Sequence, residues 1–416
     1  MRIVFFVSLS SLLFAQNLQT LLVYAKEHNA LITSTKLQAK SKAKELGSAE
    51  KSYYPTLDIS GFYKRDDKPS PMQPGTVYGG GGAVGWDVYK GGRRSYTKKA
   101  LQEEYLAKKH TSYATQKDIS LDIVKTFFSI KTLQAQKKAQ EDAKKAIHAQ
   151  LERMRGFYEA KLATEDMLLR LQSAYDKSDY TIASLKFEIY SQKKALSLLV
   201  GKKVDILEDS SFKKPDAPGA ETLDAIKALK YTKTSLLYKA RLISSSYYPT
   251  ITLKDTFMLY GYDDKPAVNI PGMGQIPIEL LKKQNRLEAN IYFRLFDFGV
   301  LKEQKEALML EANALAEKIA YRQKEQQMQI ALSKERIKTT YMQLKSAKSA
   351  LKASQSAFKI VEEKYTNGIV DNITYLDALK TKTQAHSAYE KAKNDIEIAY
   401  GIYYYYLSKN LEEELQ

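Results

Sequence analysis

The sequence of 416 residues contains no cysteine, one tryptophan and four histidines. Without cysteine the chain has no disulfide framework, no thiolate nucleophile and no zinc site built on thiolates. The histidines at positions 28, 110, 148 and 386 stand far apart, and no two have the spacing of a metal-binding pair. We therefore expect no metal site and no cofactor.

Catalytic motifs are missing as well. The glycine run at 79–82 is not followed by the Lys and Ser or Thr of a phosphate-binding loop. The acidic pairs Asp66–Asp67 and Asp263–Asp264 have the residue type needed for acid and base chemistry. Each pair is followed by Lys and Pro in loop-like sequence, so turn formation explains them better. We expect no catalytic residues and no enzymatic activity.

Long apolar runs are absent beyond the amino terminus. Residues 1–15 start with the basic Arg2, continue through an apolar run broken only by serines, and end at the small Ala15. This pattern is typical of a secretory signal peptide. No later stretch approaches the ~20 apolar residues of a membrane-spanning helix. The mature chain is therefore expected outside the cytoplasm, and any crossing of a membrane must use strands.

The formal net charge is +17, with lysines spread along the chain rather than gathered in one block. A basic chain can bind nucleic acid, but secretion argues against such a partner and we expect none. Attraction to the anionic headgroups of outer-membrane lipid, or simply a solvated lysine-rich surface, accounts for the charge.

The most informative feature present is an internal repeat. The sequence Ser-Tyr-Tyr-Pro-Thr occurs at 52–56 and 246–250, and Asp-Asp-Lys-Pro occurs at 66–69 and 263–266. The offset between the copies grows from 194 to 207 residues and then stays constant from residue 92 onward. Insertions are thus confined to the strand region and its loop, where they disturb no packed surface. We predict one pseudo-symmetric unit rather than a string of unrelated domains.

Each half contains two segments in which apolar and polar residues alternate. They start near Leu57, Val84, Ile251 and Leu287, and Asp255 is the one charged residue on an apolar parity. The runs reach about 9 to 11 residues or more, enough for tilted strands to cross hydrocarbon. Tyrosines cluster at their ends, as in an interfacial girdle. We predict four transmembrane strands in two hairpins.

Four strands cannot close a barrel, and open edges in lipid leave backbone groups unpaired at several kcal/mol each. Other copies of the chain must then complete the sheet. Three copies of four strands supply twelve, which lies within the range of outer-membrane barrels, whereas two copies supply eight and leave little lumen. The alternative is a secreted coiled-coil scaffold protein, in which the alternation belongs to a soluble hairpin domain with one wet face.

Two segments, 92–158 and 299–365, lack proline and are rich in strong helix formers, which predicts helices ~100 Å long. Shorter segments at 164–200 and 371–408 carry the same heptad seam at an offset of 207, a period that specifies coiled-coil packing. A helix at 18–51 should stack end to end with 164–200 along one long helix, and 221–245 should do the same with 371–408.

These patterns divide the chain as follows: signal peptide, 1–15; helix of the first repeat, 16–52; transmembrane β-hairpin, 53–91; helical hairpin, 92–200; linker near the middle of the helical rod, 201–220; helix of the second repeat, 221–246; second transmembrane β-hairpin, 247–298; second helical hairpin, 299–409; acidic C-terminal tail, 410–416.

The order and spacing of these parts resemble the TolC family of outer-membrane efflux proteins over essentially the whole mature chain. The most similar local stretches are Tyr-Tyr-Pro-Thr before each first strand, Leu-Phe-Asp-Phe-Gly at 295–299, and Tyr-Thr-Asn-Gly at 365–368 with Leu-Asp-Ala at 376–378.

The resemblance implies an α+β membrane protein with two repeats, each a β-hairpin plus a long coiled-coil helical hairpin. It implies a homotrimer that forms one 12-stranded β-barrel, continued by an α-helical periplasmic tunnel in a Gram-negative bacterium. Such a channel is the passive exit duct of a tripartite pump, with a periplasmic adaptor protein and an inner-membrane pump as partners. Drugs or other small molecules are the expected cargo; metal-ion efflux and type I protein secretion are alternatives.

The resemblance also implies a periplasmic gate. By position Tyr365 and Asp377 match the family's tip tyrosine and the lower of its two aspartate rings. Val370 stands where a linking arginine is common, and Thr374 where the upper aspartate would be. The first-half counterparts at this tip are Glu165 and Asp166.

Two of these residues have alternative roles. Three copies of Asp377 around an axis would form a negative constriction, whereas an aspartate near a helix start can instead interact with the helix dipole. Tyr365 can link the gate through its hydroxyl or simply pack.

Closure of the sheet by three copies predicts that chemical cross-linking of the purified protein in detergent stops at the trimer. Gel mobility of the cross-linked species measures this. A folded, membrane-inserted monomer would contradict it.

Overall fold

The computed structural model describes residues 16–68, 73–216 and 219–416. The predicted signal peptide lies outside these residues. The described residues form two compact units: those within Met1–Leu37, His110–Lys227 and Ala320–Gln416 make the first, and those within Gln38–Lys109 and Ala228–Ile319 make the second. Each unit therefore contains parts of both sequence repeats.

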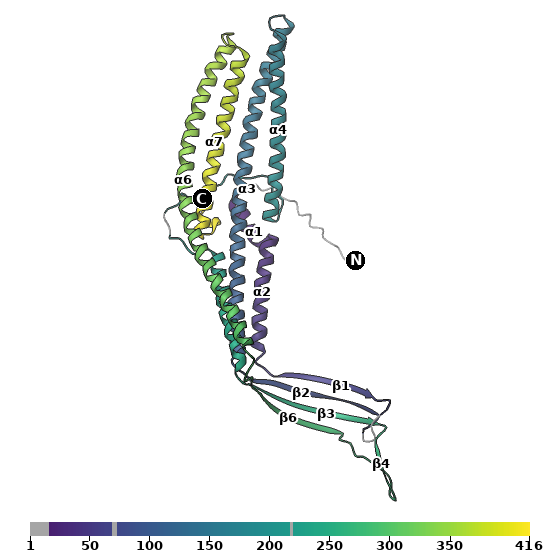
Figure 1. Ribbon diagram of the computed structural model, residues 1–416. Helices are drawn as coiled ribbons and strands as arrows, with labels where there is room; N and C mark the ends of the chain where they lie inside the picture. The colour runs from purple at the N-terminus through teal and green to yellow at the C-terminus, as the bar shows by residue number, and fades with distance from the viewer. Residues whose placement is uncertain (1–15, 69–72, 217–218) are drawn as a thin grey trace, which may run out of the picture. The chain divides into compact units, whose positions relative to one another are not determined.

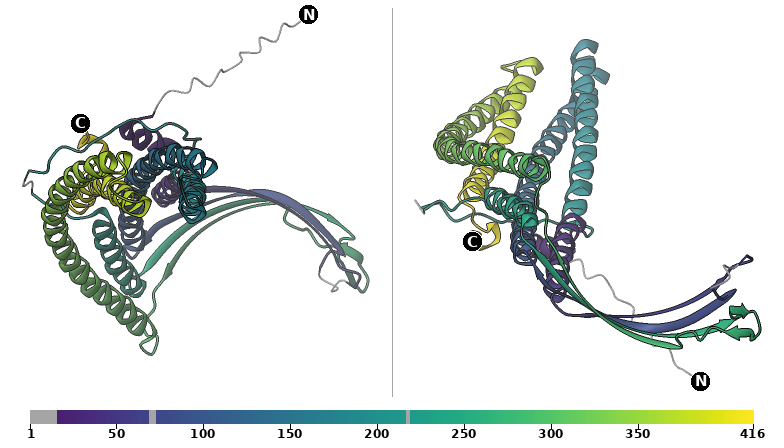
Figure 2. Two further views of the ribbon diagram at one scale, coloured as in Figure 1. Left: turned by 90° about the horizontal axis from the view of Figure 1, so that it is seen from above. Right: turned by 60° about the horizontal axis from the view of Figure 1, so that its bottom comes forward.

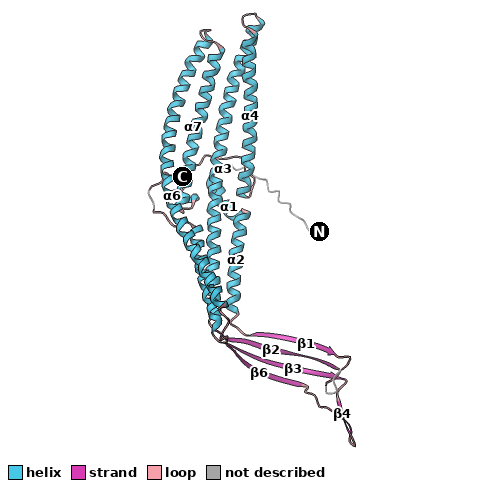
Figure 3. Ribbon diagram, in the orientation of Figure 1, coloured by secondary structure: helices cyan, strands magenta, loops and turns pink. Residues whose placement is uncertain are grey.

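Two helical hairpins build most of the first unit (Figures 1 and 3). One pairs α3 (Arg93–Glu159) with α4 (Glu165–Val200), and the other pairs α6 (Val300–Thr366) with α7 (Asn372–Tyr406). The long helices α3 and α6 are unbroken and contain 67 residues each, as their proline-free composition predicted. The structure thus repeats the same helical hairpin in both halves of the chain.

The prediction of a single helix over 18–51 is wrong. The structure has two helices there, α1 (Leu18–His28) and α2 (Ala30–Lys51). Asn29 stands between them and makes the break. Its side-chain oxygen accepts the backbone N–H groups of Leu31 at 2.9 Å and Ile32 at 3.1 Å, which caps α2. Its side-chain nitrogen donates to the Leu199 carbonyl at 2.7 Å, close to the end of α4.

After the break, α1 packs into the main hydrophobic core of the first unit. Leu18, Leu21 and Leu22 of α1 are fully buried there, together with Phe127 of α3 and Tyr404 of α7. The C-terminal segment, predicted only as an acidic tail, joins this core as well. It forms a short 3₁₀ helix, Leu411–Glu413, and buries Leu411 and Leu415 against the linker residue Phe212.

Polar side chains from the long helices hold the joint where α7 ends and α5 (Asp224–Ser244) begins. Gln326 of α6 donates to the carbonyls of Glu221 at 2.7 Å and Tyr406 at 2.9 Å. Lys117 of α3 contacts Asp224 at 2.7 Å. Burial acts to raise the pKa of Asp224, but the interactions with Lys117 and His110 prevail and hold this pKa below its usual value.

The second unit carries the sheet. Its strands are β1 (Thr56–Arg65), β2 (Thr76–Lys90), β3 (Thr250–Asp263) and β6 (Lys283–Tyr292), all antiparallel in the order β1-β2-β3-β6. The four strands curve together (Figure 2). The longer loop of the second half holds an additional small hairpin, β4 (Ala267–Ile270) and β5 (Gly274–Pro277). Strand β6 ends at Tyr292, although the alternation of residues continues to Leu295.

The strand register sorts the side chains onto two faces. Leu57 lies opposite Val84, and Leu253 lies opposite Ala289, so these apolar residues share one face. Lys254 lies opposite Glu288 on the other, polar face. Glycine at 81 is required by crowding, because a Cβ there would come within 2.0 Å of a backbone oxygen of β3. Among the helices in the described part of the chain, none is both long and apolar enough to cross a membrane.

Replacing Gly201 tests the joint between α4 and α1. Gly201 ends α4 with a φ of +84°, and a Cβ there would lie 2.8 Å from the His28 carbonyl oxygen. Gly201→Ala is therefore expected to lower stability by about 1–2 kcal/mol. Thermal unfolding in detergent, followed by helical circular dichroism, measures the change. Gly47→Ala is the matched control, since nothing lies within 4 Å of the added Cβ; equal midpoints for both variants would contradict the expectation.

Candidate functional site

The tips of the two helical hairpins have the same turn, although their sequences differ. Gly368 has a φ of +72°, and its N–H donates to the Tyr365 carbonyl at 3.1 Å. At the matching place of the first half, Lys161 has a φ of +58°, and its N–H donates to the Tyr158 carbonyl at 2.9 Å. Lysine thus takes the left-handed conformation that normally favours glycine. The repeat fixes the backbone here even where it does not conserve the residue.

Thr374 belongs to the start of α7. Asp371 caps this helix by accepting the backbone N–H of Thr374 at 2.9 Å and its hydroxyl at 2.7 Å. These bonds hold the pKa of Asp371 below its usual value. Sequence analysis missed Asp371, although an aspartate immediately before a helical pattern is a recognisable capping signal.

The first-half tip lacks a side-chain cap of this kind, although Thr164 occupies the N-cap position of α4. Asp166 accepts the hydroxyl of Thr164 and lies 3.7 Å from the guanidinium of Arg170. The bond from Thr164 lowers the pKa of Asp166; burial opposes this shift, and the charge of Arg170 supports it. Asp166 and Glu165 are both exposed in the first turn of α4. There they interact favourably with the helix dipole.

Tyr365 packs within a small aromatic core at the tips. Its ring stacks on Tyr375 with 4.7 Å between centroids, and Phe358 lies 5.6 Å from Tyr375 on the other side. Tyr375 is 1% exposed, and burial raises its pKa to about 12. Burial also raises the pKa of the half-buried Tyr365. Both hydroxyls therefore stay protonated at neutral pH.

Two hydrogen bonds join the tips of the two helical hairpins. Arg153 of α3 donates to the Thr366 carbonyl at 3.1 Å, at the end of α6. Asn372 at the start of α7 donates through its side chain to the Met167 carbonyl of α4 at 3.0 Å. Sequence analysis missed both donors. The repeat does mark the first, because the second-half counterpart of Arg153 is the apolar Ile360.

The remaining predicted residues are not part of these contacts. Asp377 is exposed and lies on the face of α7 opposite Tyr375 and Leu379, and Val370 is half-buried in the turn. The structure thus brings Tyr365, Val370 and Thr374 together at one tip and places Asp377 farther along α7. Among residues 16–68, 73–216 and 219–416, no cluster of three or more His, Asp or Glu side chains is arranged to hold a metal ion.

Solved structures share this fold over nearly the whole chain. The Campylobacter jejuni CmeC outer membrane channel superposes with a TM-score of 0.80 at 15% identity, covering 94% of this chain and 85% of that one. The outer membrane protein VceC from Vibrio cholerae superposes with a TM-score of 0.75 at 14% identity, covering 95% of this chain and 96% of that one. The Neisseria gonorrhoeae MtrE outer membrane channel, solved in its open state, superposes with a TM-score of 0.76 at 15% identity, covering 95% of this chain and 89% of that one.

Sequence comparison matches part of the chain to a protein family. No curated protein matches the chain in sequence. Residues 21–202 match the model of the outer membrane efflux protein family. Proteins of this family are transport ducts rather than enzymes, and they extend from the Gram-negative outer membrane into the periplasm. The amino-terminal part of the chain is thus similar in sequence to the outer membrane efflux protein family, and nearly the whole chain shares its fold with solved outer membrane channels.

Proposed function

We propose that three copies of this chain form the passive exit duct of a tripartite efflux pump that exports drugs or other small molecules. A periplasmic adaptor and an inner-membrane pump are the proposed partners, and the pump supplies the energy. The observation that carries the proposal is a four-stranded sheet with one apolar face and two open edges, β1 and β6.

The apolar face is exposed in the single chain. Leu57 is 72% exposed, Ile59 85% and Leu287 73%, all on the same face of the sheet. Such a face is unfavourable in water and suits hydrocarbon. In hydrocarbon the edge strands β1 and β6 need partners for their main-chain groups. Joining β1 of one copy to β6 of the next supplies these partners, and three copies close a twelve-stranded wall.

The helices of the first unit offer matching surfaces for a second copy. On α4 an exposed apolar seam runs along one side, and Phe187 within it is 71% exposed. On α6 Tyr321, Met328 and Met342 are exposed at multiples of seven residues. A heptad spacing of exposed apolar residues predicts packing against another helix. The seam on α4 consists of Leu169, Tyr180, Phe187 and Leu198.

The gate of the proposed duct lies at the helical tips. The bonds from Arg153 and Asn372 and the stacked pair Tyr365 and Tyr375 tie the two hairpins of one chain together. Widening the duct at this end requires the hairpins to separate there. We propose that Tyr365 acts by packing, and that Arg153 takes the linking role for which Val370 is unsuited.

The duct is tested by ion conductance of the purified protein in planar bilayers. We expect channels from the parent and a loss of both trimers and channels in Phe187→Asp, because a charge in the apolar seam prevents packing with a second copy. Lys186→Asp is the matched control, since it places the same residue on the neighbouring exposed position outside the seam. Conducting trimers of Phe187→Asp would contradict the seam, and a parent without conductance would contradict the duct.

The tip contact is tested by amide hydrogen exchange. Arg153→Met removes the bond to the Thr366 carbonyl, and a bond from a charged donor contributes about 1.5–3 kcal/mol. Exchange at 366–373 is therefore expected to become at least about tenfold faster. Arg155→Met is the matched control, because Arg155 contacts Glu152 and Gln172 within its own hairpin. Equal exchange in the two variants would contradict a link through Arg153.

A further inference from the structure

The exposed polar stripe that contains Asp377 has a counterpart on α4. Along α7 the exposed positions follow one side of the helix at intervals of three and four residues. Subtracting the repeat offset of 207 gives positions on α4 that form a similar stripe with small and polar side chains. The α7 stripe is Thr374, Asp377, Thr381, Gln384, Ala388 and Lys391, and the α4 stripe is Met167, Arg170, Ala174, Lys177, Thr181 and Ser184.

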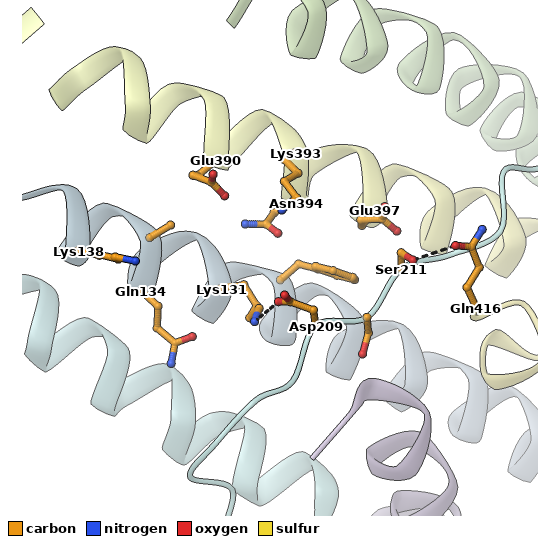
Figure 4. A pocket seen from close by; sticks show the side chains of 13 residues that line it. Lys131, Gln134, Lys138, Asp209, Ser211, Glu390, Lys393, Asn394, Glu397 and Gln416 are labelled. Carbon is orange, nitrogen blue, oxygen red and sulfur yellow. Dashed lines mark hydrogen bonds and ion pairs between the residues drawn. The ribbon is translucent and has the colours of Figure 1, made fainter. Parts of the chain in front are cut away.

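The linker, residues 201–220, contacts α4 and α7 on the side opposite to the two stripes. The backbone N–H of Phe212 donates to Glu397 of α7 at 2.7 Å, and that of Val204 donates to Ser197 of α4 at 3.1 Å. A cavity of about 600 Å³ lies on this side, and Glu397 and Asn394 of α7 belong to its lining. Figure 4 shows that Asp209 of the linker pairs there with Lys131 of α3, and that Ser211 donates to Gln416. A second cavity, lined by Lys391 and Asp395 and not by the linker, lies on the other side of α7.

The two stripes lie on the same side of their helices as this second cavity. Asp395 lies two residues from Glu397, which on an α-helix is a little more than half a turn. Glu188, its counterpart on α4, is nine residues from Ser197, which is again about half a turn. Both stripes therefore lie on the side of the helical layer that faces away from the linker. In the proposed duct this polar side lines the tunnel, and the linker lies outside.

We infer that Arg170 alternates with Asp377 around the tip of the tunnel and forms a mixed-charge ring. The inference rests on the proposed trimer. The repeat places Arg170 and Asp377 at equivalent positions, so three copies supply three guanidinium and three carboxylate groups at one level. The resemblance alone implies a purely acidic ring there. The difference lies in Arg170, whose charge opposes the accumulation of cations that such a ring would cause.

The surroundings of Arg170 agree with this role. Its guanidinium lies 3.7 Å from Asp166 of the same helix. Its charge also reaches α7, where it adds to the larger effect of the hydrogen bonds from Thr374 in lowering the pKa of Asp371. Farther along the stripes the counterparts Glu188 and Asp395 are both acidic. Lys177 and Lys391 add positive charge farther along the stripes, but their counterparts Gln384 and Ser184 are uncharged, so opposite charges at equivalent positions of the two stripes occur only at Arg170 and Asp377.

The ring is tested by the ratio of K⁺ to Cl⁻ permeability, from the zero-current potential of the full-length protein in planar bilayers under a KCl gradient. Arg170→Gln is expected to raise this ratio about twofold or more, because it removes the positive charges from the ring. Asp377→Asn is expected to lower the ratio by a similar factor. The double variant should return toward the parent value.

Two variants separate the ring from other effects of charge. Arg170→Lys keeps the charge and should match the parent. Lys186 is two residues from both Ser184 and Glu188 of the stripe, which places it on the opposite, linker side of α4. Lys186→Gln removes a charge from that side and should also keep the permeability ratio of the parent. A conducting Arg170→Gln channel with the parent ratio, or an equal shift in Lys186→Gln, would overturn the ring. Absence of conductance in the parent would instead contradict the proposed duct.

Discussion

The main-chain groups along the open edges of β1 and β6 are the constraint on which the architecture depends. A soluble sheet can leave its edges to water, but a sheet whose exposed face carries Leu57, Ile59 and Leu287 is suited to hydrocarbon, where water cannot replace a missing strand. In the proposed duct, each chain meets this requirement by contributing four strands to a shared wall.

In each half of the chain, two shorter helices meet at a joint where the structure could otherwise have one long helix. The cost lies at the joints, where helix ends leave backbone groups unpaired. The neighbouring long helices supply the missing partners: Gln326 binds the carbonyls on both sides of one joint, and Lys117 holds Asp224 beside it. At the other joint Asn29 caps α2 and reaches the end of α4. Each half thus solves the same problem with different residues.

Much of this fold could be predicted from the sequence, because the repeat and the periods of two and seven residues are long-range patterns. The features that could not be predicted are local. The break at Asn29 depends on a carbonyl of α4 that is 170 residues away, and the C-terminal residues Leu411 and Leu415 look like parts of an acidic tail until the linker covers them. At the tips, Tyr365 and Thr374 could be placed by position, and the capping role of Asp371 could have been inferred from the sequence, but the contact of Arg153 with the Thr366 carbonyl follows only from the folded arrangement.

The strength of the tip contacts is consistent with a gate. The bond from Arg153 to the Thr366 carbonyl and the bond from Asn372 to the Met167 carbonyl together contribute about 2–4.5 kcal/mol per chain. Stacking of Tyr365 on Tyr375 adds about 0.5–1.5 kcal/mol. These contributions favour the joined tips by roughly 10²- to 10⁴-fold per chain, so a partner must prefer the separated tips by at least this factor to part them.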